Sequence, residues 1–250
     1  MRLAAAYAAL CLVQAIAVLL PGRALPLPER LRGRAWALVL PGVLVAFVAG
    51  LELDPSLASS LAALAVVTPV LALAAPLVAA RRARAWVALL AVTAVWIGLW
   101  QQHGVVGGAA RTCAIACACS LLATLLAGVA PARWLRIGLL ALVAIDVALV
   151  ISGSVGHTST ALHQASPPGG LPSFQDATIA PATMGYGDLF GAAVLGALLT
   201  AEGRTHLRSA TAVLLAALAF GLLLTVFDEL PATVPLLAGL AVTRYERRAM

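Results

Sequence analysis

The sequence has little charge and no lysine. Only 10% of its 250 residues are charged and 62% are hydrophobic, with a mean hydropathy of +1.02. Soluble domains carry about 25% charged residues, so the composition predicts a polytopic membrane protein. All 16 basic residues are Arg, and they lie in short clusters between apolar runs. With aromatic residues at 5%, the chain lacks base-stacking surfaces, and its basic pI near 9.9 does not indicate nucleic-acid binding.

Metal-binding patterns are also missing. The four Cys residues lie inside apolar runs, and the spacing of Cys117 and Cys119 does not fit a zinc site. No His-Glu-x-x-His motif is present. We therefore predict no metal and no organic cofactor. His157 and His163 lie in a polar segment, and we interpret them as solvated loop residues.

Nine apolar runs are long enough to cross a membrane, which takes about 20 residues. They cover residues 3–20, 35–51, 56–80, 85–100, 113–130, 135–152, 180–201, 209–227 and 231–243. A segment rich in Ser, Pro, Gly and Thr, residues 153–179, connects the sixth run to the seventh. The prediction is an all-α fold with one membrane domain, residues 1–250, and nine transmembrane helices.

The positions of the Arg residues predict the orientation. The Arg residues alternate between linkers. They lie in the linker after the first span, in every second linker from there on, and in the carboxyl-terminal tail; only Arg2 and Arg111 lie elsewhere. Cytoplasmic segments carry the excess of positive charge. The N-terminus is therefore predicted outside, the C-terminus in the cytoplasm, and 153–179 forms an external loop.

Two of the ten acidic residues, Asp146 and Asp188, lie inside predicted spans. Asp146 is 10 residues past Arg136, and Asp188 is 14 residues before Glu202. At about 1.5 Å per helical residue, they lie roughly 15 and 21 Å from the cytoplasmic edge, near the middle of a core about 30 Å thick. Their spans are consecutive and antiparallel, so the two carboxylates can face each other. Buried ionisable groups of this kind indicate a functional site.

A facing carboxylate pair has well-defined chemistry. Two such groups in a low-dielectric site do not both ionise readily, so they share a proton. The ionised carboxylate can deprotonate a water while the protonated one polarises a carbonyl, which hydrolyses an amide without a covalent intermediate. The same pair could relay protons in a proton-coupled transporter. The scarcity of polar residues in the first five spans argues against a transport pathway.

Three short motifs occur in order around these residues. Asp146 lies in Val-Ala-Ile-Asp, Asp188 ends Gly185-Tyr186-Gly187-Asp188, and Pro-Ala-Thr (231–233) begins the ninth span. The chain resembles the presenilin and signal peptide peptidase family of intramembrane aspartyl proteases, which has Tyr-Asp, Gly-x-Gly-Asp and Pro-Ala-Leu at these places. Ile145 and Thr233 depart from that pattern. The resemblance is best over 135–243 and is strongest with bacterial-type members.

The resemblance implies a presenilin-like bundle that hydrolyses peptide bonds within transmembrane segments or remnant signal peptides. Asp146 and Asp188 would be the catalytic pair. By the same resemblance, Gly185, Tyr186 and Gly187 shape the site, and Pro231, Ala232 and Thr233 hold substrate. The implied partners are transmembrane peptides and the lipid bilayer, and the implied location is the plasma membrane, as a multi-pass protein.

The glycines and a proline near Asp188 suggest how substrate binds. Gly185 and Gly187 have no Cβ, so another backbone can pass close to the reacting centre. A helix must unwind to be cut, and its freed backbone groups then need new partners within the membrane. We hypothesise that segment 177–187 pairs with the unwound substrate as an added β-strand. Pro181 keeps this segment from being helical.

Two other interpretations of the Asp188 motif are less favourable. Thr183 to Asp188 resembles a potassium-channel selectivity filter. Pro172 and Pro181 interrupt the preceding stretch, and only 15 residues separate Asp188 from Arg204, too few for an inner helix. Prepilin peptidases also use Gly-x-Gly-Asp with a second Asp. They often carry a cytosolic Cys-rich insert, which this sequence lacks.

Overall fold

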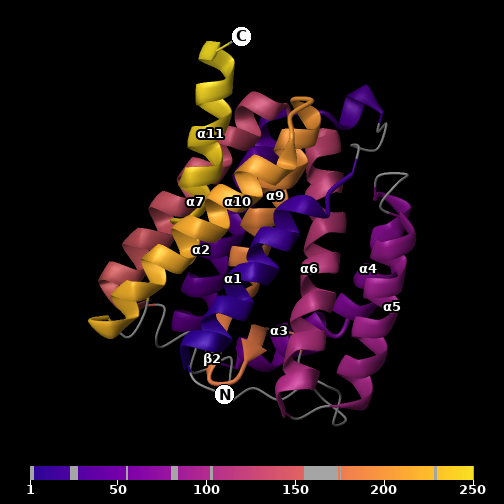
Figure 1. Cartoon of the computed structure of the whole chain (residues 1–250), viewed down its shortest axis with the longest axis vertical. Helices are drawn as coiled ribbons and strands as arrows, with labels where there is room; N and C mark the ends of the chain where they lie inside the picture. The colour runs from indigo at the N-terminus through magenta and orange to yellow at the C-terminus, as the bar shows by residue number, and fades with distance from the viewer. Residues whose placement is uncertain are drawn as a thin grey trace.

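The fold is a bundle of helices with one short β-hairpin. The computed structural model describes residues 3–22, 28–54, 56–79, 84–101, 104–154, 174, 176–227 and 230–249. His157, His163 and most of the predicted external loop lie outside these residues. α1 begins at one end of the molecule, and α11 ends at the other (Figure 1).

The helices follow the apolar runs of the sequence. They are α1 (Leu3–Leu19), α2 (Val39–Leu53), α3 (Leu57–Ala65), α4 (Thr68–Ala74), α5 (Arg84–Trp100), α6 (Gly104–Val129), α7 (Ala132–Ser152), α9 (Tyr186–Ala201), α10 (His206–Phe220) and α11 (Leu236–Ala249). Short 3₁₀ segments are η1 (Glu29–Leu31), η2 (Arg34–Leu38), η3 (Ala75–Leu77) and η5 (Gly221–Thr225).

Several of these helices are suited to a membrane. Five helical segments are long and apolar enough to cross one: 34–53, 57–77, 104–129, 132–152 and 206–224. α1, α5 and α9 are shorter apolar helices. Large apolar side chains such as Leu53, Trp100 and Ile151 are exposed on the outside of the bundle, as expected for a surface that faces lipid. The chain thus has the helical, apolar build of a membrane protein, while the number of nine spans and their orientation stay predictions.

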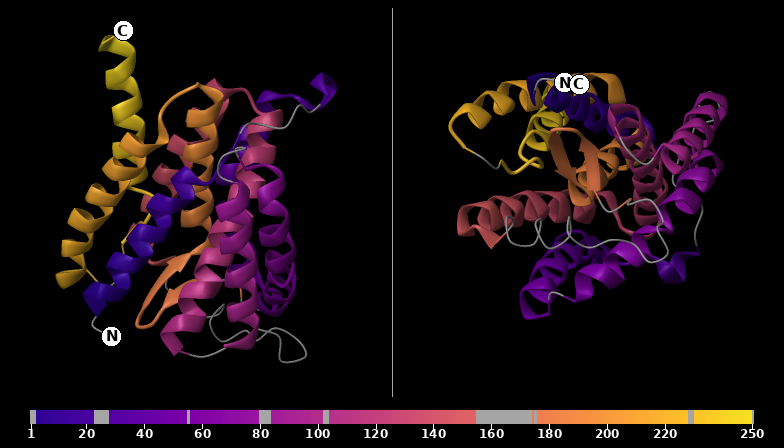
Figure 2. Two further views of the ribbon diagram at one scale, coloured as in Figure 1. Left: turned by 45° about the vertical axis from the view of Figure 1, so that its right-hand side comes forward. Right: turned by 90° about the horizontal axis from the view of Figure 1, so that it is seen from below.

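α6 and α9 form the centre of the bundle. α6 packs against α1, α4, α5 and α9, and most of its residues are buried. Nearly all of α9 from Leu189 to Leu199 is buried as well. Seen from below, the hairpin lies among the surrounding helices (Figure 2).

The hairpin replaces the first part of a predicted helix. β1 (Asp176–Ile179) pairs antiparallel with β2 (Ala182–Gly185), with Thr178 opposite Thr183. Residues 180–185 were predicted within a span and 176–179 within a loop, but 176–179 and 182–185 are strands and 180–181 form the turn between them. Pro181 lies in the connecting turn, where its missing N–H costs nothing. The expectation that segment 177–187 is not helical is confirmed for residues 177–185 and is wrong for 186 and 187, which begin α9.

Other predicted span boundaries also shift. The run 56–80 is divided into α3 and α4, and Pro69 lies in the first turn of the second helix, a favoured place for Pro. α6 begins nine residues before the predicted start at 113. The predicted run 209–227 ends as the 3₁₀ segment η5, and 231–243 becomes helical only at Leu236. Pro231 and Pro235 account for that late start, because neither has a backbone N–H to donate to a hydrogen bond within a helix.

Glycine allows α9 to lie directly against α1. A Cβ at Gly196 would collide with the carbonyl oxygen of Val18, so the close approach of these two helices requires a residue without a side chain. Small residues at such contacts are typical of helix packing in membranes.

We predict that Gly196→Ala destabilises the bundle by about 1–3 kcal/mol, the usual cost of overpacking. Thermal unfolding of the purified protein in detergent measures this as a lower Tm. Gly42→Ala in α2 is the matched control, since a Cβ there meets nothing within 4 Å. Equal effects of the two variants would contradict this account of the α1–α9 contact.

Candidate active site

Asp188 lies in the first turn of α9, directly after the hairpin. Its Oδ2 accepts a hydrogen bond from the backbone N–H of Gly185 at 3.0 Å. The N-terminus of a helix carries partial positive charge and unpaired N–H groups, which favour a carboxylate there. Gly185 ends β2 and caps α9, so the Gly-x-Gly-Asp motif forms the joint between strand and helix.

Asp146 lies on α7 and contacts the segment that precedes α11. Its Oδ2 accepts two hydrogen bonds from Thr233, one from the hydroxyl at 2.6 Å and one from the backbone N–H at 3.3 Å. Thr233 is buried, whereas Asp146 is half-buried. Thr233 departs from the family motif, and it supplies a hydroxyl donor that Leu lacks.

Helices α7 and α9 pack together and bring the two carboxylates into one region. A Cβ at Gly191, three residues after Asp188, would lie 3.2 Å from Leu142 and 3.0 Å from Leu236. Leu142 precedes Asp146 by one helical turn, and Leu236 follows Thr233. Asp146 and Asp188 are thus carried by two helices that are in direct contact. Three motifs that are far apart in the sequence therefore meet in space.

The remaining predicted site residues lie around this pair. Tyr186 begins α9, and its carbonyl oxygen lies 3.9 Å from the thiol sulfur of Cys119. Gly187 is exposed, and a Cβ built on it meets nothing within 4 Å, so the space beside Gly187 is open. Pro231 and Ala232 are half-buried in the turn before α11.

A residue of α1 also belongs to this region and was not predicted. The side-chain amide of Gln14 donates to the carbonyl of Ala232 at 2.8 Å. The only sequence signal for Gln14 was its polarity within an apolar run. Within the described ranges, no three His, Cys, Asp or Glu side chains are grouped so as to bind a metal ion.

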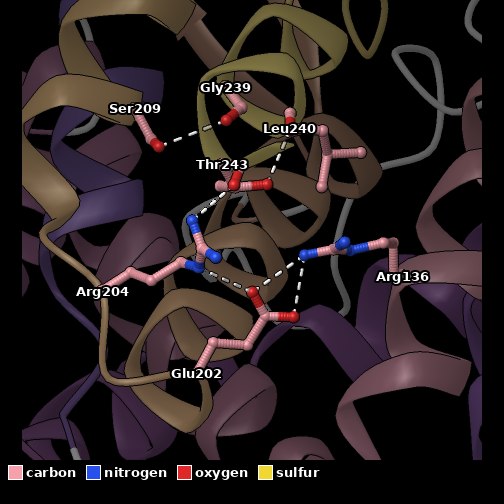
Figure 3. Close-up of polar contacts among 7 residues, drawn as sticks. All are labelled: Arg136, Glu202, Arg204, Ser209, Gly239, Leu240 and Thr243. Carbon is pink, nitrogen blue, oxygen red and sulfur yellow. Dashed lines mark hydrogen bonds and ion pairs between the residues drawn. The ribbon is translucent and has the colours of Figure 1, made fainter. Parts of the chain in front are cut away.

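At the opposite end of α9 from the hairpin, a charge cluster joins the helices that carry the site. Glu202 accepts from Arg136 through both carboxylate oxygens, each at 2.8 Å, and lies 3.1 Å from Nε of Arg204. Arg204 also donates to the carbonyl of Thr243 in α11 (Figure 3). The cluster thus connects α7, the end of α9 and α11. Its Arg residues come from two linkers predicted to lie on one side of the membrane.

We predict that Glu202→Ala lowers stability by about 3–5 kcal/mol, because it removes the shared acidic partner of two largely buried Arg side chains. The measurement is the Tm of the purified protein in detergent. Glu29→Ala, at an exposed position in η1, is the control and should leave the Tm near that of the wild type. An unchanged Tm for Glu202→Ala would show that the cluster contributes little to stability.

Comparison of the chain with protein-family models, curated proteins and solved structures finds no match.

Proposed function

We propose that this protein is an intramembrane aspartyl endopeptidase, with Asp146 and Asp188 as its catalytic pair. The observation that carries the proposal is their arrangement on neighbouring helices. α7 and α9 pack directly against each other, and each carboxylate accepts a hydrogen bond from a backbone N–H of a different motif segment, Gly185 for Asp188 and Thr233 for Asp146. Such donors fix the orientation of a carboxylate without occupying both of its oxygens.

The proposed reaction is hydrolysis by a shared-proton pair. The ionised carboxylate takes a proton from a water molecule as the water oxygen attacks the peptide carbonyl carbon, while the protonated carboxyl group donates its proton to the carbonyl oxygen. The tetrahedral product then collapses. Its C–N bond breaks as the carboxyl group that took the proton from water passes it to the nitrogen, while the other carboxylate takes a proton from a hydroxyl group of the tetrahedral species. A new carboxyl group and an amine are released, and the pair again holds one proton. Which Asp begins as the acid is left open, because such pairs titrate jointly.

The hairpin supports the proposal that substrate binds in extended form. Within the described part of the chain, the sheet contains only β1 and β2, so β2 has one edge that no strand occupies. β2 ends three residues before Asp188. A transmembrane peptide that unwinds beside β2 could pair its freed N–H and C=O groups with this edge. Its scissile bond would then lie close to the carboxylate pair.

The test is cleavage by the purified full chain in lipid vesicles, with a single-span peptide as substrate. Mass spectrometry should show two fragments cut within the apolar segment. In H₂¹⁸O, the new carboxyl terminus should gain one heavy oxygen atom, as water-mediated hydrolysis requires. Intact peptide under all conditions would refute the proposal.

The same vesicles distinguish the rival functions. Solute uptake driven by a pH gradient and lost in Asp146→Asn would identify a proton-coupled transporter instead. A potassium current that survives Asp146→Asn would identify a channel. Cleavage confined to the cytoplasmic junction of a pilin-like leader, with no cut inside the apolar segment, would favour a prepilin-peptidase-like enzyme.

A further inference from the structure

One polar side chain is buried on the otherwise apolar helix α1. Gln14 is 1% exposed, and its Nε2 donates to the carbonyl oxygen of Ala232 at 2.8 Å. Ordering and burying a long polar side chain is costly unless its hydrogen bonds are made. The first helix of the chain thus reaches the segment that touches Asp146, 218 residues further along.

The Ala232 carbonyl needs a donor from outside its own segment. In a regular helix the Ala232 carbonyl would accept from the N–H of Leu236, but that N–H donates to the carbonyl oxygen of Thr233 at 3.0 Å. The alternative donor one residue earlier is position 235, which is Pro and has no N–H. An unpaired carbonyl at membrane depth would cost several kcal/mol. Gln14 supplies the donor.

The peptide group between Ala232 and Thr233 is held at both ends. Its C=O accepts from Gln14 at 2.8 Å, and its N–H donates to Asp146 at 3.3 Å. A hydrogen bond accepted by the carbonyl polarises the peptide group and strengthens the bond that its N–H donates. It also fixes the orientation of the peptide plane, and therefore the place of the Thr233 hydroxyl, which donates to the same carboxylate oxygen.

We propose that Gln14 is a positioning residue for catalysis: through the Ala232–Thr233 peptide group it orients and stabilises the Asp146 carboxylate. This inference depends on the proposed protease function. Without the Gln14 amide, the peptide group is free to rotate, the N–H donor to Asp146 is weakened, and the pair spends less time in its reactive arrangement.

The test compares three variants of the full chain in vesicles. Gln14→Met keeps the length of the side chain and removes its donor. Gln14→Glu restores a donor only where the introduced carboxyl group is protonated. Leu10→Val, one turn earlier on α1 and also buried, is a packing control that leaves the hydrogen bond intact.

For Gln14→Met we expect kcat to fall about 5- to 10-fold, the value of one neutral hydrogen bond, with KM nearly unchanged. The acidic limb of its pH–rate profile should move to higher pH, because the ionised Asp146 loses support. Gln14→Glu should approach the wild-type rate at low pH, where the introduced carboxyl group is protonated. Its rate should fall below that of the wild type as pH rises and this group loses its proton. Leu10→Val should change neither kcat nor the profile. Equal profiles for Gln14→Met and Leu10→Val would overturn the inference while leaving the protease function standing.

An infrared measurement distinguishes failure of the proposed role of Gln14 from failure of the proposed protease function. The carboxyl bands of Asp146, assigned by their loss in Asp146→Asn, should shift in Gln14→Met and stay in place in Leu10→Val. If the wild-type protein cleaves no peptide, the proposed function fails, and the catalytic role of Gln14 fails with it. An unshifted band in Gln14→Met would refute the coupling of Gln14 to Asp146 through the Ala232–Thr233 peptide group, whether or not cleavage occurs.

Discussion

We expect Asp146→Asn and Asp188→Asn each to lower kcat for peptide cleavage at least about 1000-fold, within the range that acid–base catalysis contributes. Asn keeps the shape of Asp and an oxygen that accepts from Thr233 or Gly185, so the helices should remain in place. It can neither take a proton from water nor donate one as an acid. Hydrolysis needs one carboxyl group to take a proton from water and the other to donate one, so each single variant should be as inactive as the double variant.

Fragment yield in reconstituted vesicles measures this loss, and a Tm close to that of the wild type shows that the variants are folded. Asp54→Asn is the matched control, since Asp54 follows α2 at an exposed position outside the three site motifs. There its carboxylate accepts from the backbone N–H and the hydroxyl of Ser56, which hold its pKa below the usual range. If either site variant retained wild-type cleavage, the pair would not be catalytic.

Thr233→Val lowers kcat about 10- to 100-fold, because a hydrogen bond to a charged group contributes about 1.5–3 kcal/mol. Val replaces the hydroxyl with a methyl group of similar size, so the packing of this buried position changes little. The backbone N–H still reaches Asp146, which is why the loss is smaller than in the Asp variants. Thr233→Ser retains the hydroxyl and should keep most of the activity.

The pH dependence of Thr233→Val gives an independent check. Donors to a carboxylate favour its ionised form, so removing the hydroxyl makes the pair hold its proton more tightly. The acidic limb of the pH–rate profile should therefore move to higher pH in Thr233→Val and stay in place in Thr233→Ser. A lower kcat with an unshifted profile would mean that Thr233 acts through substrate binding rather than through Asp146.

Parts of the fold and site could be predicted from local patterns. Apolar runs and Arg clusters locate helices because burial in lipid and charge placement act on each segment separately. The two Asp residues stand out because charge is rare within such runs. Pro181 indicated an extended segment because its effect on the backbone is local.

Other features depend on contacts between distant segments, which no local pattern contains. The start of α6 is a stretch of low hydropathy around Gly107 and Gly108, and it was interpreted as a linker. A Cβ at these glycines would collide with the carbonyl oxygens of Gln101 and Thr178, respectively. The segment is helical where it packs against β1, so its glycines serve close approach rather than a turn. The bonds from Gln14 to Ala232 and from Thr233 to Asp146 are likewise visible only in the folded chain.

The contact between Gln14 and Ala232 has a consequence for biosynthesis. The ribosome makes α1 long before residues 231–235. Asp146 and Asp188 are likewise translated before the peptide group that supports Asp146. A nascent chain lacks that support until residues 231–235 have been made, so the proposed protease would gain full activity only after this segment has been synthesised and packed.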